Sequence, residues 1–164
     1  MNLEGILHQL VEEKKFRKLR GILEEMNEVD IAEFIQEIEQ DKVVLVFRLL
    51  PKELGAEVFA CLEIDMQEYI INSMSDYELQ KIIEELYIDD AVDMLEELPA
   101  TVVRRVLANA KPDTRALINQ FLQYPDDSAG SIMTAEYIGL KKNMTVEQSF
   151  AYIRRNAVDK ETIY

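Results

Sequence analysis

Apolar residues recur every three or four positions up to about residue 124, which is the spacing of amphipathic helices. The pattern predicts two helices within residues 3–26 and eight more, at 29–39, 41–50, 51–62, 65–74, 76–87, 89–98, 99–109 and 112–124. Each predicted helix is only two to four turns long and cannot be stable alone in water. The helices must therefore be stabilised by packing side by side.

Local start signals support this division into short helices. Ser75-x-x-Glu78 and Thr145-x-x-Gln148 are typical of capping boxes, in which a hydroxyl and a carboxyl or amide satisfy the first backbone N–H groups. Three prolines suit first helical turns, where no N–H is needed: Pro51, Pro99 and Pro112.

Weak internal repeats indicate how the helices are arranged. The pattern Asp-φ-x-acid-φ-φ, with φ apolar or aromatic, occurs at 30–35, 65–70 and 90–95. Repeated helix pairs that bury one face on their neighbours build a curved superhelix. The sequence therefore predicts a mainly α fold, a right-handed-type superhelix of about ten short stacked helices.

The pattern changes after Gly130, which is expected to act as a backbone hinge. Residues 137–140 form a short β-candidate, and Thr145 then caps a helix expected to turn three apolar residues inward, Val146, Phe150 and Ile153. We therefore predict a helical domain over 1–130. Residues 131–164 are predicted to form a linker and a strand plus helix.

Charge is concentrated in the middle of the chain. The net charge is −14, and residues 27–99 hold twenty acids and only four bases. Such a field repels nucleic acid and anionic lipid and attracts cations. It is consistent with a solvated face that aids solubility or with a surface that responds to cations, and the composition leaves both open.

Most enzymatic and metal chemistries lack candidate residues. His8 and Cys61 are the only histidine and cysteine, which makes zinc and disulfides improbable, and no nucleophile or nucleotide motif occurs. Cys61 is expected to fill core space. The longest apolar run, 43–47, is far too short to span a membrane, so no direct membrane insertion is expected. A single cysteine fits a reducing compartment and the cytoplasm.

Paired carboxylates leave hard-cation chemistry open. Asp89 and Asp93 are four positions apart and share a helix face, which Asp90 flanks. A divalent cation between two carboxylates converts their repulsion into attraction, and Mg²⁺ needs only one or two of them. Acids in a first helical turn also favour the positive end of the helix dipole without any metal.

Two motifs resemble a known family. Residues 124–134 (YPDDSAGSIMT) and the helix at 89–99 (DDAVDMLEELP) stand in the order found in MgtE-type magnesium transporters. There the first motif joins the helical amino-terminal domain to the first CBS domain. The resemblance covers nearly the whole chain. It implies that residues 131–164 are the incomplete start of that α/β CBS domain.

The resemblance also implies a regulatory function. It makes the chain the cytoplasmic portion of an inner-membrane magnesium channel or transporter, in which Mg²⁺ bound at domain interfaces favours the closed pore. Asp89, Asp90 and Asp93 match the family's acid-rich helix, and Glu57 falls where the family carries a further ligand. The implied partners are the CBS pair, the connecting helix and the transmembrane domain, in a homodimer. Because these parts supply the opposing ligands, weak Mg²⁺ binding is expected here.

Two other classes of function remain to be weighed. A metal-independent helical-repeat scaffold with an acidic face for a basic partner fits the same helices and charge. An enzyme using paired carboxylates ranks last, because no substrate-pocket signature accompanies the acids.

Overall fold

Eleven helices follow one another in the computed structural model, which describes residues 3–125, 127–157 and 160. In chain order they are α1 (Leu3–Glu12), α2 (Phe16–Leu23), α3 (Glu28–Glu37), α4 (Gln40–Phe47), α5 (Lys52–Ala60), α6 (Ile64–Ser73), α7 (Asp76–Ile83), α8 (Ile88–Glu97), α9 (Ala100–Asn109), α10 (Pro112–Phe121) and α11 (Val146–Asn156). No described helix combines the length and apolar character needed to cross a bilayer. Asp126 and residues 158–159 and 161–164 of the predicted second segment lie outside the described residues.

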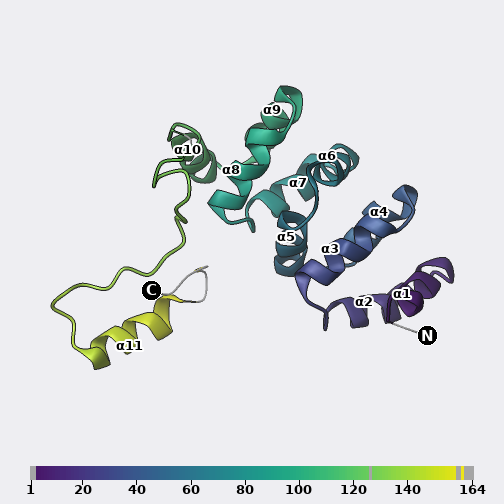
Figure 1. The fold of residues 1–164 in the computed structure, drawn as a ribbon, viewed down its shortest axis with the longest axis horizontal. Coiled ribbons are helices and arrows are strands. Elements are labelled where there is room, and N and C mark those ends of the chain that lie inside the picture. The colour runs from purple at the N-terminus through teal and green to yellow at the C-terminus, as the bar shows by residue number, and fades with distance from the viewer. Residues whose placement is uncertain (1–2, 126, 158–159, 161–164) are drawn as a thin grey trace.

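The first ten helices form a curved row, with α1 and α2 at one end and α10 at the other (Figure 1). Within the row, helices pack repeatedly on the helix two places further along: α3 on α5, α5 on α7, α7 on α9, α4 on α6 and α8 on α10. This pattern is that of stacked helix pairs. It confirms the predicted stack of about ten short helices, and the hand of the superhelix stays a prediction.

One apolar core runs through this row. Its largest fully buried side chains come from eight helices: Leu7, Leu19, Leu23, Ile31, Ile35, Val43, Phe59, Ile70, Ile71, Leu79, Ile83 and Ile118. Burying one such side chain is worth about 1.5–3 kcal/mol. Helices of eight to eleven residues are therefore held by their neighbours and not by their own hydrogen bonds.

The helix ends follow most of the start signals. Both capping boxes are formed, at Ser75 of α7 and Thr145 of α11, and Pro112 is the first residue of α10. The prediction for Pro51 and Pro99 was off by one position. Both precede their helices as N-cap residues, with ψ of 156° and 141°, because an N-cap residue keeps an extended backbone.

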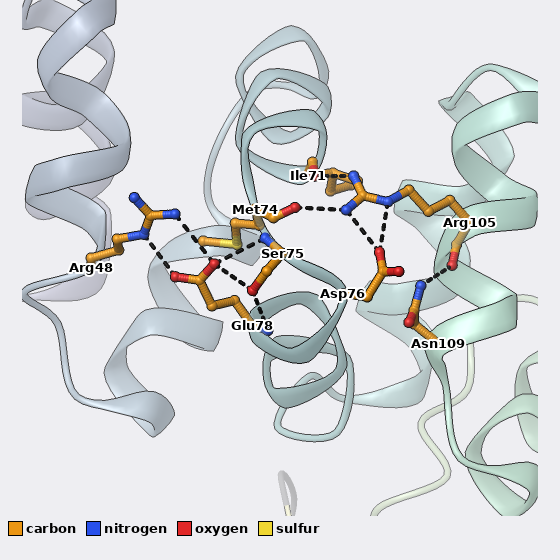
Figure 2. Close-up of polar contacts among 8 residues, drawn as sticks. All are labelled: Arg48, Ile71, Met74, Ser75, Asp76, Glu78, Arg105 and Asn109. Carbon is orange, nitrogen blue, oxygen red and sulfur yellow. Dashed lines mark hydrogen bonds and ion pairs between the residues drawn. The ribbon is translucent and has the colours of Figure 1, made fainter.

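Arg105 of α9 joins its helix to the turn between α6 and α7 (Figure 2). Its guanidinium donates to the carbonyl oxygens of Ile71 and Met74, both at 2.6 Å, and to the Asp76 carboxylate at 2.9 Å. The carbonyls that end a helix have no partner within it. Arg105 therefore satisfies the end of α6 from another helix.

Glu78 of α7 makes the corresponding contact on the other side of the same turn (Figure 2). Its carboxylate accepts from Arg48 at 2.8 Å and from the Ser75 backbone N–H at 2.9 Å. The Arg48 hydrogen bond, followed by those from Ser75, lowers the pKa of Glu78 to about 2. These contacts tie the end of α4 to the start of α7.

The segment after residue 130 corrects two predictions. The expected strand at 137–140 is absent from the described chain, where only Tyr137 forms an isolated bridge. A strand needs a neighbouring strand for its backbone hydrogen bonds, and the described residues offer none. Two of the three apolar residues of α11 do not point inward as expected, since Val146 and Phe150 are 73% and 55% exposed. Ile153 is half-buried, and none of the described residues of α11 is fully buried. In Figure 1, α11 lies apart from the row.

Gly130 allows the segment after α10 to pack closely on Tyr124, and its role as a hinge stays a prediction. The described glycines include none with positive φ. A Cβ placed on Gly130 would come within 2.6 Å of the Tyr124 ring. That ring packs edge-to-face on Phe121, with centroids 5.7 Å apart. The segment after α10 therefore lies against the end of the stack through this glycine.

We expect Gly130→Ala to lower the free energy of unfolding by about 1–3 kcal/mol, because the new methyl group displaces the Tyr124 ring. Gly21→Ala is the matched control, since no atom lies within 4 Å of its new Cβ. In the middle of α2 it should stabilise by about 0.5–1 kcal/mol. Urea unfolding of both variants measures this, and equal effects would contradict the close-packing role.

We expect Arg105→Ala to lower the free energy of unfolding by about 2–3 kcal/mol, because it leaves the carbonyls of Ile71 and Met74 without their charged donor. Arg104→Ala serves as the control, because Arg104 bonds only to Ala100 of its own helix. Its effect should stay within about 0.5 kcal/mol. Thermal unfolding measures both variants, and similar losses of stability would show that the hydrogen bonds of Arg105 do not stabilise the fold.

Candidate functional site

Helix α8 orients the acids that the sequence singles out. Ala91, Val92 and Leu95 are buried on its inner face. This orientation leaves Asp89 and Asp90 half-buried in the first turn and Asp93 exposed one turn later. The expected four-residue spacing of Asp89 and Asp93 within one helix is therefore present.

Glu57 of α5 and Asp90 of α8 line one cleft of about 410 Å³, which we call the α5–α8 cleft. Glu28 and Glu85 contribute two further carboxylates to it. Only the tertiary structure brings these four acids together, because they come from three helices and the turn after α7.

Cys61 also lines this cleft, and the negative charge of the cleft affects the pKa of its thiol. It is exposed, which corrects the prediction that it fills core space, because it follows the last residue of α5 and lies outside the packed face. Partial burial, and then the negative charges of nearby carboxylates, raise the pKa of its thiol. Those carboxylates belong to Glu28, Asp90 and Glu57.

A second cleft, the α6–α8 cleft, has a volume of about 490 Å³. Asp90 and Asp93 line it from α8, together with Glu63 before α6 and Glu97 at the end of α8. Its floor includes Gln67, which is buried and donates to the Phe59 carbonyl at 2.9 Å. Asp90 therefore stands between two acidic clefts.

Glu57 also lines a third cleft of about 390 Å³, which we call the linker cleft. Its glutamates come from α5, from the end of α7 and from the segment after α10: Glu53, Glu57, Glu84, Glu85 and Glu136. The last of these is distant in sequence from the others. It brings the segment after residue 130 against the acidic face.

Glu136, from the segment after α10, lies at the start of the acid-rich helix α8. The N-cap residue of α8, Tyr87, makes no side-chain cap, and the Glu136 carboxylate lies close enough to the Ile88 N–H for that group to lower its pKa. Burial is the largest effect and raises the pKa of Glu136, and the negative charge of Asp89 raises it further. Together they outweigh the lowering by the Ile88 N–H. One oxygen of Asp89 is itself buried. The two carboxylates therefore repel each other at the start of α8.

Some of these acids have cationic partners and others do not. Lys52 pairs with Glu85, and Lys111 pairs with Glu84 at 3.0 Å. Burial alone would raise the pKa of Glu84, but the Lys111 backbone N–H and ammonium group lower it. Across the described chain, no hydrogen bond or ion pair is made by the carboxylates of Glu57 and Asp93.

The four predicted residues are thus divided by the structure. Glu57 and Asp90 share one cleft, Asp90 and Asp93 share another, and Asp89 faces Glu136. Sequence reasoning missed the remaining lining acids, chiefly Glu136, because nothing local to residue 136 indicates α8 as its neighbour. The carboxylate oxygens of the acids that line these clefts suit a hard cation that keeps part of its water shell, such as Mg²⁺.

Comparison with known proteins identifies the family. The sequence model of the MgtE intracellular N domain matches residues 26–127. The chain belongs to the MgtE intracellular N domain family. It is 35% identical over 162 residues to the magnesium transporter MgtE of Thermus thermophilus and 21% identical over 154 residues to that of Bacillus subtilis.

These alignments cover 96% and 94% of this chain but only 36% and 34% of the two transporters. The chain therefore spans about a third of the length of these curated relatives. Both relatives are magnesium transporters.

Solved structures agree with the family assignment. The cytosolic domain of the Mg²⁺ channel MgtE, crystallised with ATP, superposes with a TM-score of 0.85 at 34% identity, over 99% of this chain and 68% of that one. The soluble part of a magnesium transporter superposes with a TM-score of 0.85 over 98% of this chain and 65% of that one. At 22% identity, this second structure supports the fold alone.

We expect Glu136→Gln to raise the free energy of unfolding at pH 7 by up to about 1 kcal/mol, since half-exposed charges interact weakly. The change removes repulsion from Asp89 and keeps an acceptor for Ile88. A raised folded-state pKa means that the ionised carboxyl destabilises the native state. The gain should therefore disappear as the pH falls toward the ordinary value of 4.5.

Urea unfolding between pH 4 and 7 measures this gain. Glu33→Gln is the control, because Glu33 lies exposed in the middle of α3. A gain that is equal for both variants, or independent of pH, would mean that the local repulsion is unimportant.

Proposed function

We propose that this MgtE N domain is the cytosolic magnesium-sensing regulatory domain of a magnesium channel or transporter. Its acidic surface binds Mg²⁺ where other domains meet it, and the bound ions favour the closed pore. Glu57, Asp89, Asp90 and Asp93 are its ligands on this chain. The CBS pair, the connecting helix and the transmembrane domain of the same transporter, a homodimer, are its partners.

The observation that carries this proposal is the shared cleft of Glu57 and Asp90. Two helices fixed by the core hold these acids beside Glu28 and Glu85 in one cleft. Of these acids, Glu85 pairs with Lys52. Like charges that line one cleft repel one another. A divalent cation relieves that repulsion.

Sensing requires that the ion prefer one arrangement of the domains. A ligand shifts an equilibrium only by its differential affinity for two states. Open clefts that supply carboxylates from one side meet this condition, because a second domain must complete the coordination. When Mg²⁺ is scarce, the acids on this chain repel acids across the interface and the domains separate. When it is abundant, bridging ions favour the compact state.

This chain therefore supplies only some of the ligands of each Mg²⁺ site, and the other domains supply the rest. Mg²⁺ keeps several waters and takes one or two carboxylates directly, so the isolated domain should bind it weakly. Asp93 and Glu57, which have no partner in the described chain, are the acids most available to an ion. Asp89 acts nearer the segment after residue 130, beside Glu136.

We expect millimolar Mg²⁺ to raise the melting temperature of this chain more than Na⁺ does at matched ionic strength. At a few times its Kd, a ligand stabilises by about 1 kcal/mol, which is roughly 2–4 °C for a domain of this size. The double variant Glu57→Gln/Asp90→Asn should lose at least about half of this difference, because it removes both predicted ligands from the α5–α8 cleft.

The control is Glu33→Gln/Asp41→Asn, which makes the same change of charge at two exposed positions. In the full-length transporter, the cleft variant should also weaken the protection from protease that Mg²⁺ confers. Equal shifts with Mg²⁺ and Na⁺, insensitive to the variants, would instead favour the metal-independent scaffold with an acidic binding face.

A further inference from the structure

We propose that Glu4, His8 and Glu37 form a second metal site, for a divalent transition-metal ion such as Zn²⁺, at the amino-terminal end of the stack. One ligand atom from each residue lies within 4.8 Å of the other two. In the row of helices, α1 and α3 lie apart from α8 (Figure 1).

Two helices supply the three donors. Glu4 and His8 are four positions apart in α1 and share a face, and Glu37 is the last residue of α3. Ligands around one tetrahedral Zn²⁺ at about 2.1 Å are about 3.4 Å apart. Since both glutamates are exposed, small rotations of their side chains can bring the three ligand atoms to that shorter spacing.

His8 is held in place for this role. It is half-buried, and its ring packs edge-to-face on Phe34, with centroids 5.4 Å apart. Phe34 is one turn before Glu37 in α3. The same helix therefore orients the imidazole and supplies a carboxylate.

The helix end adds a favourable field. Glu37 stands at the carboxyl end of α3, where the partial negative charge of the helix favours cations. In the last turns of α1 and α3 there is no basic residue. Two carboxylates and the carboxyl end of α3 thus place negative charge beside the imidazole.

The donor set selects the kind of metal. Imidazole with two carboxylates is a nitrogen and oxygen set that Zn²⁺ and its neighbours accept, with water in the remaining position. Mg²⁺ prefers oxygen ligands and an octahedral shell. Sequence reasoning dismissed zinc by counting one cysteine and one histidine, and carboxylate ligands supply the missing donors.

We expect the chain to bind Zn²⁺ in the presence of excess Mg²⁺, measured by competition with a chromophoric chelator. Excess Mg²⁺ competes for the carboxylates of the clefts, and a Cys61→Ser background removes the exposed thiol. Loss of even an outer-shell partner of a metal commonly costs ten- to hundredfold in affinity. His8→Gln and Glu37→Gln should therefore each lower Zn²⁺ affinity at least about tenfold.

Glu33→Gln is the matched control, one turn before Glu37 on the same helix, and should leave the affinity unchanged. Because the site links α1 to α3, Zn²⁺ should also raise the melting temperature of the parent and not of His8→Gln. Circular dichroism without metal confirms that the variants fold. Zn²⁺ binding that is insensitive to His8, or equal losses for Glu33→Gln and Glu37→Gln, would overturn the site and leave the magnesium proposal untouched.

Discussion

Packing between short helices is the constraint on which everything else in this domain depends. Helices of eight to eleven residues do not persist alone in water, so each must bury its apolar face on a neighbour. The repeated contact of each helix with the one two places along extends this burial into a row. A row exposes two long faces, and on such faces a domain can carry charge without weakening its core.

The acidic surface follows from this architecture. Twenty acids lie within residues 27–99, and the inward apolar faces of α5 and α8 force their carboxylates outward. Clefts between successive helices then gather acids from different elements. Polar contacts such as those of Arg105 and Glu78 lock neighbouring helices (Figure 2). They keep these carboxylates at fixed positions despite their mutual repulsion.

Much of the fold could be read from local pattern. Helical periodicity and the two capping boxes locate the elements within a few residues, because these signals depend on neighbours in sequence. Predictions of position and burial at element ends were weaker. Cys61, Pro51 and Pro99 stand at helix boundaries, where a shift of one position changes exposure. The apolar residues Val146 and Phe150 form a helix as expected, but nothing in the described chain covers them.

The sequence by itself determined that this protein is a stack of short helices with a concentrated negative charge and an acid-rich helix, predicted at 89–98. Those properties depend on residue order and composition alone. Only the tertiary structure decided which acids meet: Glu57 with Asp90, Glu136 with the start of α8, and Glu4 with Glu37 beside His8. These pairs are separated by tens of residues. Their proximity depends on how the helices pack, and no local sequence pattern encodes the distance between residues so far apart in the chain.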